Sequence, residues 1–316
     1  MILKKTALII GAGASRPYLF PTARELTQLL LGQNVERQNV PNDVLINMGF
    51  QTGGYGAFCK WLHARLGQHH ISIGDLEHFQ RRFRLSQFYS VDAFLAANPI
   101  FKELGALLIA CILLKCEKEE SLEGDWYQLL FNELVAEGKD FPDGQLSIVT
   151  FNYDRSLEMY LYKTFRSAYD LSEADAWAIV RRVKIIHVYG SLGPLPRMSN
   201  QQGIRYGNDG AMEEASSYIR LVQPRAESEK IDEIRAVIEA AGRVVFLGFG
   251  FDAMNLDAIG ARYSTVPMFA SCYNLSVPAM KLATKRLRDP GRSDIIKWGD
   301  RAHHVADFLH NSEALA

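Results

Sequence analysis

Short apolar runs of strand length recur along this chain, and this recurrence constrains the fold more than any other feature of the sequence. The runs span residues 6–10, 146–151, 183–189, 243–249 and 266–271. Segments with the helical spacing of apolar residues separate them, among them 22–31, 154–162, 172–182 and 229–241. Strands that alternate with helices form a mainly parallel sheet with helices on both faces. The sequence therefore predicts an α/β fold.

A long segment between the first two runs interrupts this alternation. Residues 39–138 contain no convincing strand. Helical patterns in this segment cover 58–66, 100–115 and 125–137. We interpret residues 39–138 as a large helical insertion, and residues 1–38 together with 139–316 as the domain that carries the sheet.

Composition and charge indicate a globular protein and give no sign of a nucleic-acid-binding, membrane-spanning or metal-binding protein. With 48% hydrophobic residues among 316, the chain can bury a large core. Its formal net charge of -1 gives no overall positive field, so we expect no direct binding to nucleic acid or to an acidic membrane. The longest apolar stretch, 104–114, is too short for a hydrocarbon core that needs roughly 20 residues. The four cysteines form no CxxC pair, which predicts no metal site and suits the reducing cytoplasm.

The glycine turn GAGAS (residues 11–15) directly follows the first apolar run. Gly11 and Gly13 allow the backbone to turn tightly and to approach a pyrophosphate, while the next helix offers amide donors and Ser15 offers a hydroxyl. Arg16 stands at the sixth position of the dinucleotide fingerprint GxGxxG, so the fingerprint is incomplete. The motif alone leaves nucleotide binding and a plain strand-to-helix connection equally open.

Asn152 and Asp154 belong to the second motif, TFNYD (residues 150–154), just beyond the end of a predicted parallel strand. Ligands of open α/β sheets bind at this edge, which favours a functional role for Asn152. The structural alternative is that the two side chains satisfy a turn and cap the next helix. For this motif alone, the structural alternative is the stronger one.

His187 opens the third motif, HVYGSLG (residues 187–193), near the end of a predicted strand. An imidazole with an ordinary pKa near roughly 6.5 accepts a proton at neutral pH, which makes His187 the candidate general base. Gly190 and Gly193 let the chain bend around a ligand, and residues 193–209 are expected to form a long loop over the site. A histidine that is hydrogen-bonded in the core is the structural alternative, and the motif in isolation favours it.

A fourth segment, FLGFGFDAMN (residues 246–255), repeats the order of strand and glycine turn. It places Asp252 and Asn255 where a ribose or an adenine would be hydrogen-bonded. Capping of the next helix by either residue is an equally good interpretation.

In this order, GAGAS with the following Pro21 and Thr22, then TFNYD, HVYGSLG and LGFGFD, resemble the sirtuin superfamily, and within it the bacterial sirtuin-like domains of antiphage defence systems. The resemblance spans most of the chain and constrains the helical insertion least. It implies a Rossmann-like sheet with an inserted smaller domain, NAD as the ligand, and catalysis by Asn152 and His187. The residues that it places around NAD are Gly11, Ala12, Gly13, Ser15 and Thr22 near the phosphates and ribose, Gly248 and Phe251 near the adenosine, and also Asp154, Gly190 and Asp252.

Two departures from the sirtuin pattern bear on the reaction. The chain lacks the four-cysteine zinc module of deacylating sirtuins, so their peptide-binding groove is not expected. Tyr189, rather than a histidine, stands immediately before Gly190, and His187 lies two positions earlier. Strand alternation puts His187 and Tyr189 on one face, so either ring is a candidate to face the ribose.

The chemistry of NAD then predicts a reaction. Nicotinamide leaves a cationic ring system as a neutral molecule, so no general acid is needed and the transition state resembles an oxocarbenium ion. We expect Asn152 to orient the ribose hydroxyl or the attacking water and His187 to accept the proton, which yields nicotinamide and ADP-ribose.

An enzyme of this kind would drain the cell of NAD unless it is restrained. The resemblance implies control by homo-oligomerisation or by a separate phage-sensing protein, such as an ATPase or an Argonaute-like protein. Two other functions stay open: an NAD-dependent protein deacylase or ADP-ribosyltransferase, and a noncatalytic module that binds NAD or ADP-ribose.

Overall fold

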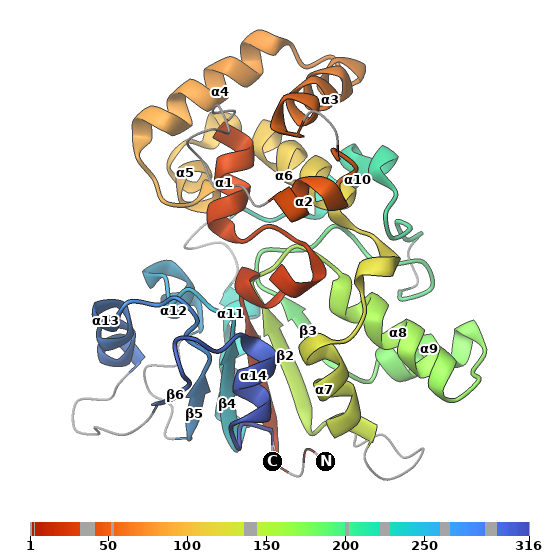
Figure 1. Cartoon of the computed structure of the whole chain (residues 1–316), viewed down its shortest axis with the longest axis vertical. Helices are drawn as coiled ribbons and strands as arrows, with labels where there is room; N and C mark the ends of the chain where they lie inside the picture. Colours follow the sequence, from red (N-terminus) through yellow and green to blue (C-terminus); the bar gives the residue numbers. More distant parts are fainter. Residues whose placement is uncertain are drawn as a thin grey trace.

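The computed structural model describes residues 2, 4–31, 42–51, 54–135, 144–199, 202–221, 228–259, 266–287 and 296–315. Its centre is a parallel sheet of six strands in the order β3-β2-β1-β4-β5-β6 (Figure 1). The strands are β1 (Thr6–Ile10), β2 (Leu146–Thr150), β3 (Lys184–His187), β4 (Arg243–Leu247), β5 (Met268–Ala270) and β6 (Ile296–Trp298). The chain runs from β1 outward to β3 and returns to the other side of β1 with β4. This is the doubly wound order of a Rossmann-like fold, and it confirms the predicted fold class.

The central strands are apolar because both of their faces are covered. Every residue of β1 (TALII) and of β4 (RVVFL) is buried, as expected for parallel strands between two layers of helices. The edge strand β6 was not predicted, since its three residues are only partly buried or exposed and carry no apolar run. Strand β3 ends at His187, two residues earlier than predicted.

Helices of two groups surround the sheet. Those beside it are α7 (Asp125–Val135), α8 (Ser156–Ala168), α9 (Glu173–Val180), α11 (Ser228–Glu239), α12 (Ala253–Ile259), α13 (Val277–Leu287) and α14 (Val305–His310). Helices α7 and α14 pack on each other and lie in front of the sheet in Figure 1. None of the helices in the described ranges is both long and apolar enough to cross a membrane.

The second group forms a helical layer beyond the carboxyl ends of the strands (Figure 1). It consists of α1 (Ala23–Leu31), α2 (Asn42–Asn47), α3 (Gly54–Gln68), α4 (Ile73–Ser86), α5 (Val91–Ala97), α6 (Lys102–Cys116) and α10 (Met212–Tyr218). Helix α6 is buried on almost all sides, which fits its nearly uniform apolar sequence. Helix α10 follows β3 in the chain but packs on α6, so segments far apart in sequence build this layer.

The described residues between β1 and β2 contain helices and no strand. The predicted limits of the insertion, after residue 38 and before residue 139, fall in 32–41 and 136–143, outside the described residues. The division into two domains at these positions therefore stays a prediction.

Candidate active site at the carboxyl ends of the strands

Four strands end in one row, and this row brings the sequence motifs together. Ile10 pairs with Thr150 on one side and with Leu247 on the other, and Thr150 pairs in turn with His187. The glycine turn follows β1. The motifs TFNYD, HVYGSLG and LGFGFD start at the last residues of β2, β3 and β4. The register of the sheet thus places the four motifs side by side.

Asn152 is held at this row by both hydrogens of its amide group. Its Nδ2 donates to the carbonyl of Gly11 at 3.1 Å and to Oγ of Ser15 at 2.8 Å. Because a carbonyl can only accept, the bond to Gly11 fixes which side-chain atom is the nitrogen. Among the described residues, Oδ1 of Asn152 then has no hydrogen-bond partner, although the residue is only 7% exposed. A buried acceptor without a hydrogen bond costs about 1–3 kcal/mol of stability, so Oδ1 is suited to accept a hydrogen bond from a hydroxyl of a ligand.

Asp154 joins the glycine turn to the start of α8. Its Oδ2 accepts from Oγ of Ser15 at 2.8 Å, and its Oδ1 accepts from the amide of Ser156 at 3.2 Å and from the hydroxyl of Ser156. Burial raises the pKa of Asp154 above its ordinary value, although these hydrogen bonds act against the rise. Tyr127 of α7 extends the network with a 2.7 Å hydrogen bond to Ser156. Asp154 therefore has the helix-capping and loop-holding contacts that its sequence position indicates, whereas its role in NAD binding stays a prediction.

His187 has a protein partner at each ring nitrogen. Nδ1 lies 2.9 Å from the carbonyl oxygen of Asn152, and Nε2 lies 2.8 Å from Oε1 of Glu158 in α8. The carbonyl of Asn152 can only accept, so Nδ1 donates to it, and the carboxylate of Glu158 favours a proton on Nε2 as well. Burial lowers the pKa of His187, but the charge and the hydrogen bond of Glu158, together with the Asn152 carbonyl, outweigh it and raise the pKa. In this arrangement His187 fixes the backbone of Asn152, and its role as a general base stays a prediction.

Glu158 is a residue of this site that the sequence did not reveal. It lies in the first turn of α8, is 4% exposed, and pairs with His187. A glutamate in the first turn of a helix is ordinary, because it complements the helix dipole. Only the tertiary structure shows that this one is buried against a histidine.

We expect replacement of His187 by Gln to change the pH dependence of stability. Because the folded-state pKa lies above the unfolded value, the stabilisation by protonated His187 is complete below about pH 6.5 and is lost as the pH rises through the folded-state pKa. Urea unfolding should therefore show that His187→Gln costs more free energy of unfolding at pH 6 than at pH 9.

Glu158→Gln is the matched control, since it keeps a hydrogen-bonding group of the same size but removes the charge that raises the pKa. The Glu158→Gln variant should lose most of the pH dependence of stability that His187 gives the wild type. An equal cost of His187→Gln at both pH values would show that folding does not raise the pKa of His187.

The glycines of the first and fourth motifs pack on each other. A Cβ atom on Gly11 would lie 2.7 Å from the carbonyl oxygen of Gly248, and one on Gly248, at φ +56°, would lie 2.0 Å from the amide nitrogen of Ala14. The amide of Gly13 donates to the carbonyl of Gly248 at 3.0 Å. This close backbone approach requires glycine at these positions without any ligand. The predicted approach of the turn to a pyrophosphate, which includes Ala12, stays a prediction.

Two other predicted binding residues make the contacts of helix caps. The hydroxyl of Thr22 accepts from the amide of Glu25 at 3.3 Å, while Glu25 accepts from the amide of Thr22 at 2.6 Å, which together form a capping box at α1. Asp252 accepts from the amide of Met254 at 2.9 Å at the start of α12. For Thr22 and Asp252 the structure therefore shows structural roles.

Gly190 and Phe251 also have roles in packing. Gly190 has φ +72°, and a Cβ there would lie 2.0 Å from the carbonyl oxygen of Tyr218. This approach lets the chain beyond α10 form a bridge with Gly190 through Ile219. Phe251, also at positive φ, packs its ring against Phe246 at 5.3 Å between centroids.

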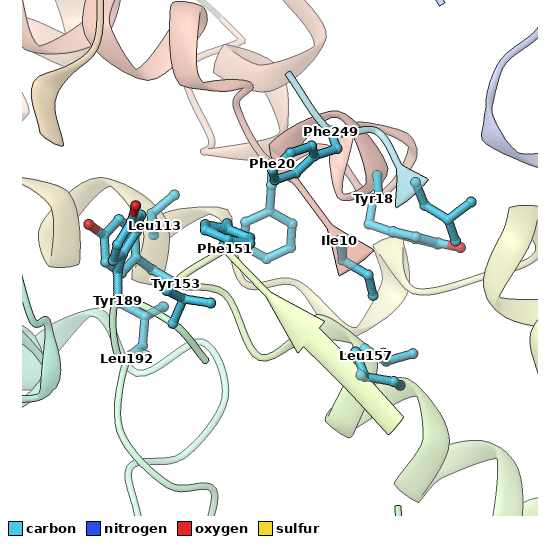
Figure 2. Close-up of a cluster of buried hydrophobic side chains, with 14 of the residues drawn as sticks. Ile10, Tyr18, Phe20, Leu113, Phe151, Tyr153, Leu157, Tyr189, Leu192 and Phe249 are labelled. Atoms are coloured by element: carbon cyan, nitrogen blue, oxygen red, sulfur yellow. The ribbon is translucent and has the colours of Figure 1, made fainter. Parts of the chain in front are cut away.

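Aromatic side chains cover the row of strand ends. Phe151 meets Tyr189 edge to face at 5.5 Å between ring centroids, and it contacts Phe249 at 5.1 Å. Figure 2 shows Tyr153 and Tyr189 beside Leu113, with Phe151 between this group and Phe249. Phe151, Tyr189 and Phe249 are each less than 10% exposed. These rings therefore form an aromatic cluster at the strand ends.

Tyr189 spans the row rather than sharing the partners of His187. Its hydroxyl donates to Oδ1 of Asn255 in α12, which follows β4. Tyr189 itself follows β3, and β2 and β1 lie between these two strands. Because β3 ends at His187, strand alternation no longer applies at Tyr189, and the two rings have different neighbours.

A buried ion pair anchors the loop beside the site. Arg155, which is 1% exposed, donates from Nη2 to Glu117 at 2.6 Å and from Nη1 to the carbonyl of Ile204 at 2.8 Å. Glu117 also accepts from the amide of Gly207 at 2.9 Å. The pair thus ties the described parts of the predicted loop 193–209 to the end of α6 and the start of α8.

A hollow on the surface lies away from the strand ends. A hollow along α4 is lined by Glu77, Gln80, Arg81, Arg84 and Leu85, and so belongs to the helical layer. Within the ranges that the structure describes, no group of three or more His, Cys, Asp and Glu side chains is placed to hold a metal ion. The converging contacts at Asn152 make the strand ends the candidate site.

Two comparisons of the sequence with known proteins find no relative. The chain matches no model of a known protein family, and a search of curated proteins returns no match.

Proposed function

We propose that this protein hydrolyses NAD at the bond between nicotinamide and ribose. One observation carries the proposal: Oδ1 of Asn152 is buried at the carboxyl edge of a doubly wound sheet and, among the described residues, has no partner. Dinucleotides bind across this edge, where the strand order reverses. The likeness of the four motifs to sirtuin-like domains supports NAD as the dinucleotide.

In the proposed reaction the carbon–nitrogen bond breaks and its electron pair goes to the ring nitrogen of nicotinamide. The oxygen of water bonds to the ribose carbon, and the proton of water passes to the solvent. Asn152 orients a ribose hydroxyl or the water through Oδ1, and its position is fixed by Ser15, Gly11 and His187. We assign His187 the role of positioning Asn152, because both of its ring nitrogens are occupied.

We also propose that the hydrolase is restrained until a signal opens the site. The burial of Asn152, which is 7% exposed, supports this restraint. A second copy of the chain or a separate phage-sensing ATPase or Argonaute-like protein would supply the signal. The proposed setting is the bacterial cytoplasm, where depletion of NAD would stop phage growth.

The test is to incubate the purified protein with NAD over a range of protein concentrations and to identify the products by chromatography. Nicotinamide and ADP-ribose in equal amounts are the expected products, with a specific rate that rises with protein concentration if self-association opens the site. Transfer of ADP-ribose to the protein, or no turnover under any condition, would reject hydrolysis.

A noncatalytic module that binds NAD or ADP-ribose is the second candidate. It is favoured by the double hydrogen bonding of His187, which leaves the predicted base occupied. Tight binding of NAD without turnover, at every protein concentration and with candidate partners added, would select it.

A further inference from the structure

Exposed apolar side chains of the helical layer gather on α4 and directly after it. Among the described residues, Leu85 and Ile73 of α4 are 68% and 55% exposed, and Phe88 and Tyr89 beyond its end are also exposed. Figure 1 shows α4 at the outer edge of the helical layer, on the side away from the sheet. Large apolar side chains that gather on one exposed face mark a site of interaction with another protein.

The packing of α4 holds this face in a fixed position. On its opposite face, Phe79 and Phe83 contact Phe94 of α5 at 5.5 and 4.6 Å between ring centroids. From its last turn, Arg84 donates through Nη2 to the carbonyl of Leu31 at the end of α1, at 3.2 Å. The helix is therefore anchored on α1 and α5, and its outer face needs no rearrangement to meet a partner.

The outer face of α4 carries one ridge of side chains spaced four residues apart. The ridge consists of Ile73, Glu77, Arg81 and Leu85. The last three of these residues also line the hollow along α4. Glu77 and Arg81 are exposed, and in the part of the chain that the structure describes no ion pair or side-chain hydrogen bond includes them. The ridge therefore has the order apolar, acidic, basic, apolar, with both charges unpaired among the described residues.

This order is complementary to itself when it is reversed. Two helices pack most often with their ridges of this spacing together, at a crossing angle of about −50°. When a two-fold axis at the height of Phe79 relates two copies of the chain, their ridges run in opposite directions. Ile73 then meets Leu85 of the second copy, and Glu77 meets Arg81 of the second copy. Each contact occurs twice, as in every interface with two-fold symmetry.

We propose that the ridge of α4 is a dimer interface, on which the same ridge of a second copy of this chain packs antiparallel. Burial of Ile73 and Leu85 stabilises the dimer, and the pairs of Glu77 with Arg81 set the antiparallel register. This inference gives a surface to the second copy that the proposed function invokes, but it does not depend on turnover of NAD.

The test measures the mass of the full-length protein by sedimentation equilibrium over a range of protein concentrations. The wild type should form dimers as the concentration rises. Glu77→Lys and Arg81→Glu should each raise the dimer dissociation constant by about tenfold or more, because two like-charge pairs replace two opposite-charge pairs. Both side chains are exposed, so both variants should fold, which circular dichroism would check.

A mixture of the two variants gives the sharpest result. At an antiparallel interface the introduced lysine of one chain faces the introduced glutamate of the other, and the unchanged Arg81 faces the unchanged Glu77. The mixture should therefore dimerise as the wild type does, although neither variant does so alone. Asp232→Lys places the same charge at an exposed position of α11 and is the control, which should leave the dissociation constant unchanged.

Each outcome decides for or against the interface. A wild type that stays monomeric at every concentration overturns the dimer and leaves this face to a separate protein. A dimer that neither variant weakens, or a mixture that is no tighter than either variant alone, overturns the antiparallel packing of α4. Because the measurement needs no NAD, failure of the interface is distinguished from failure of the proposed hydrolase.

Discussion

Asn152→Ala should lower the rate constant of NAD hydrolysis, kcat, by about 100- to 1000-fold, as loss of one preorganised polar group at a reacting centre typically does. The variant removes the buried Oδ1, the atom that is free to orient a ribose hydroxyl or the attacking water. The rate should be measured by nicotinamide release under conditions in which the wild type turns over.

Ser15→Ala is the matched control for this change. It removes one of the two bonds that hold Nδ2 of Asn152, together with the bond from Ser15 to Asp154, but leaves the bond to Gly11 and the Oδ1 atom of Asn152 in place. Loss of one such hydrogen bond costs about 1 kcal/mol, so the rate should fall by less than about tenfold. If Asn152→Ala folds normally and retains more than a tenth of the wild-type rate, Asn152 does not orient the reacting groups.

Glu117→Ala should lower the free energy of unfolding by about 3–5 kcal/mol, because it leaves the guanidinium of Arg155 buried without its partner charge. The variant also removes the acceptor of the Gly207 amide, so the loop beside the site loses an anchor. Urea unfolding followed by circular dichroism would measure the change, and limited proteolysis should show earlier cleavage within 193–209.

The exposed pair of Lys163 and Glu119 provides the control for burial. Its atoms are 3.4 Å apart, but the two side chains are 39% and 52% exposed. Solvent screens such a pair, so Lys163→Ala should change stability by less than about 1 kcal/mol. A loss of similar size for both variants would mean that the pair of Arg155 and Glu117 is hydrated in solution.

The strands at the centre of the sheet could be predicted because a strand that is buried on both faces is a continuous apolar run. Strands β1 and β4 are continuous apolar runs, and each is followed at once by a glycine turn. Short or partly exposed elements have no such apolar run. This is why β6 and the short helices α2, α5 and α10 were not predicted.

The candidate site could be predicted in part. Asn152, Ser15 and Asp154 were identified from their positions after predicted strands, and the structure joins them by direct hydrogen bonds. The partners that determine what these residues do were not predictable. Glu158 and Asp92 are acidic residues on helices and Glu117 directly follows one, and the sequence does not distinguish them from solvated surface residues.

The class of fold and the motifs that end the central strands could be predicted from local patterns, because apolar runs and glycine turns are local consequences of burial and of backbone geometry. The hydrogen bonds at those ends depend on contacts between segments that are distant in sequence. The register of the sheet aligns Ile10, Thr150 and His187, and the helical layer brings Asp92 to Tyr153. A hydrogen bond or a counter-ion from a distant segment determines whether a side chain is free or occupied, and no local pattern contains that information. For His187 this meant a hydrogen-bond partner at each ring nitrogen, and for Asn152 it meant a buried oxygen without a partner among the described residues.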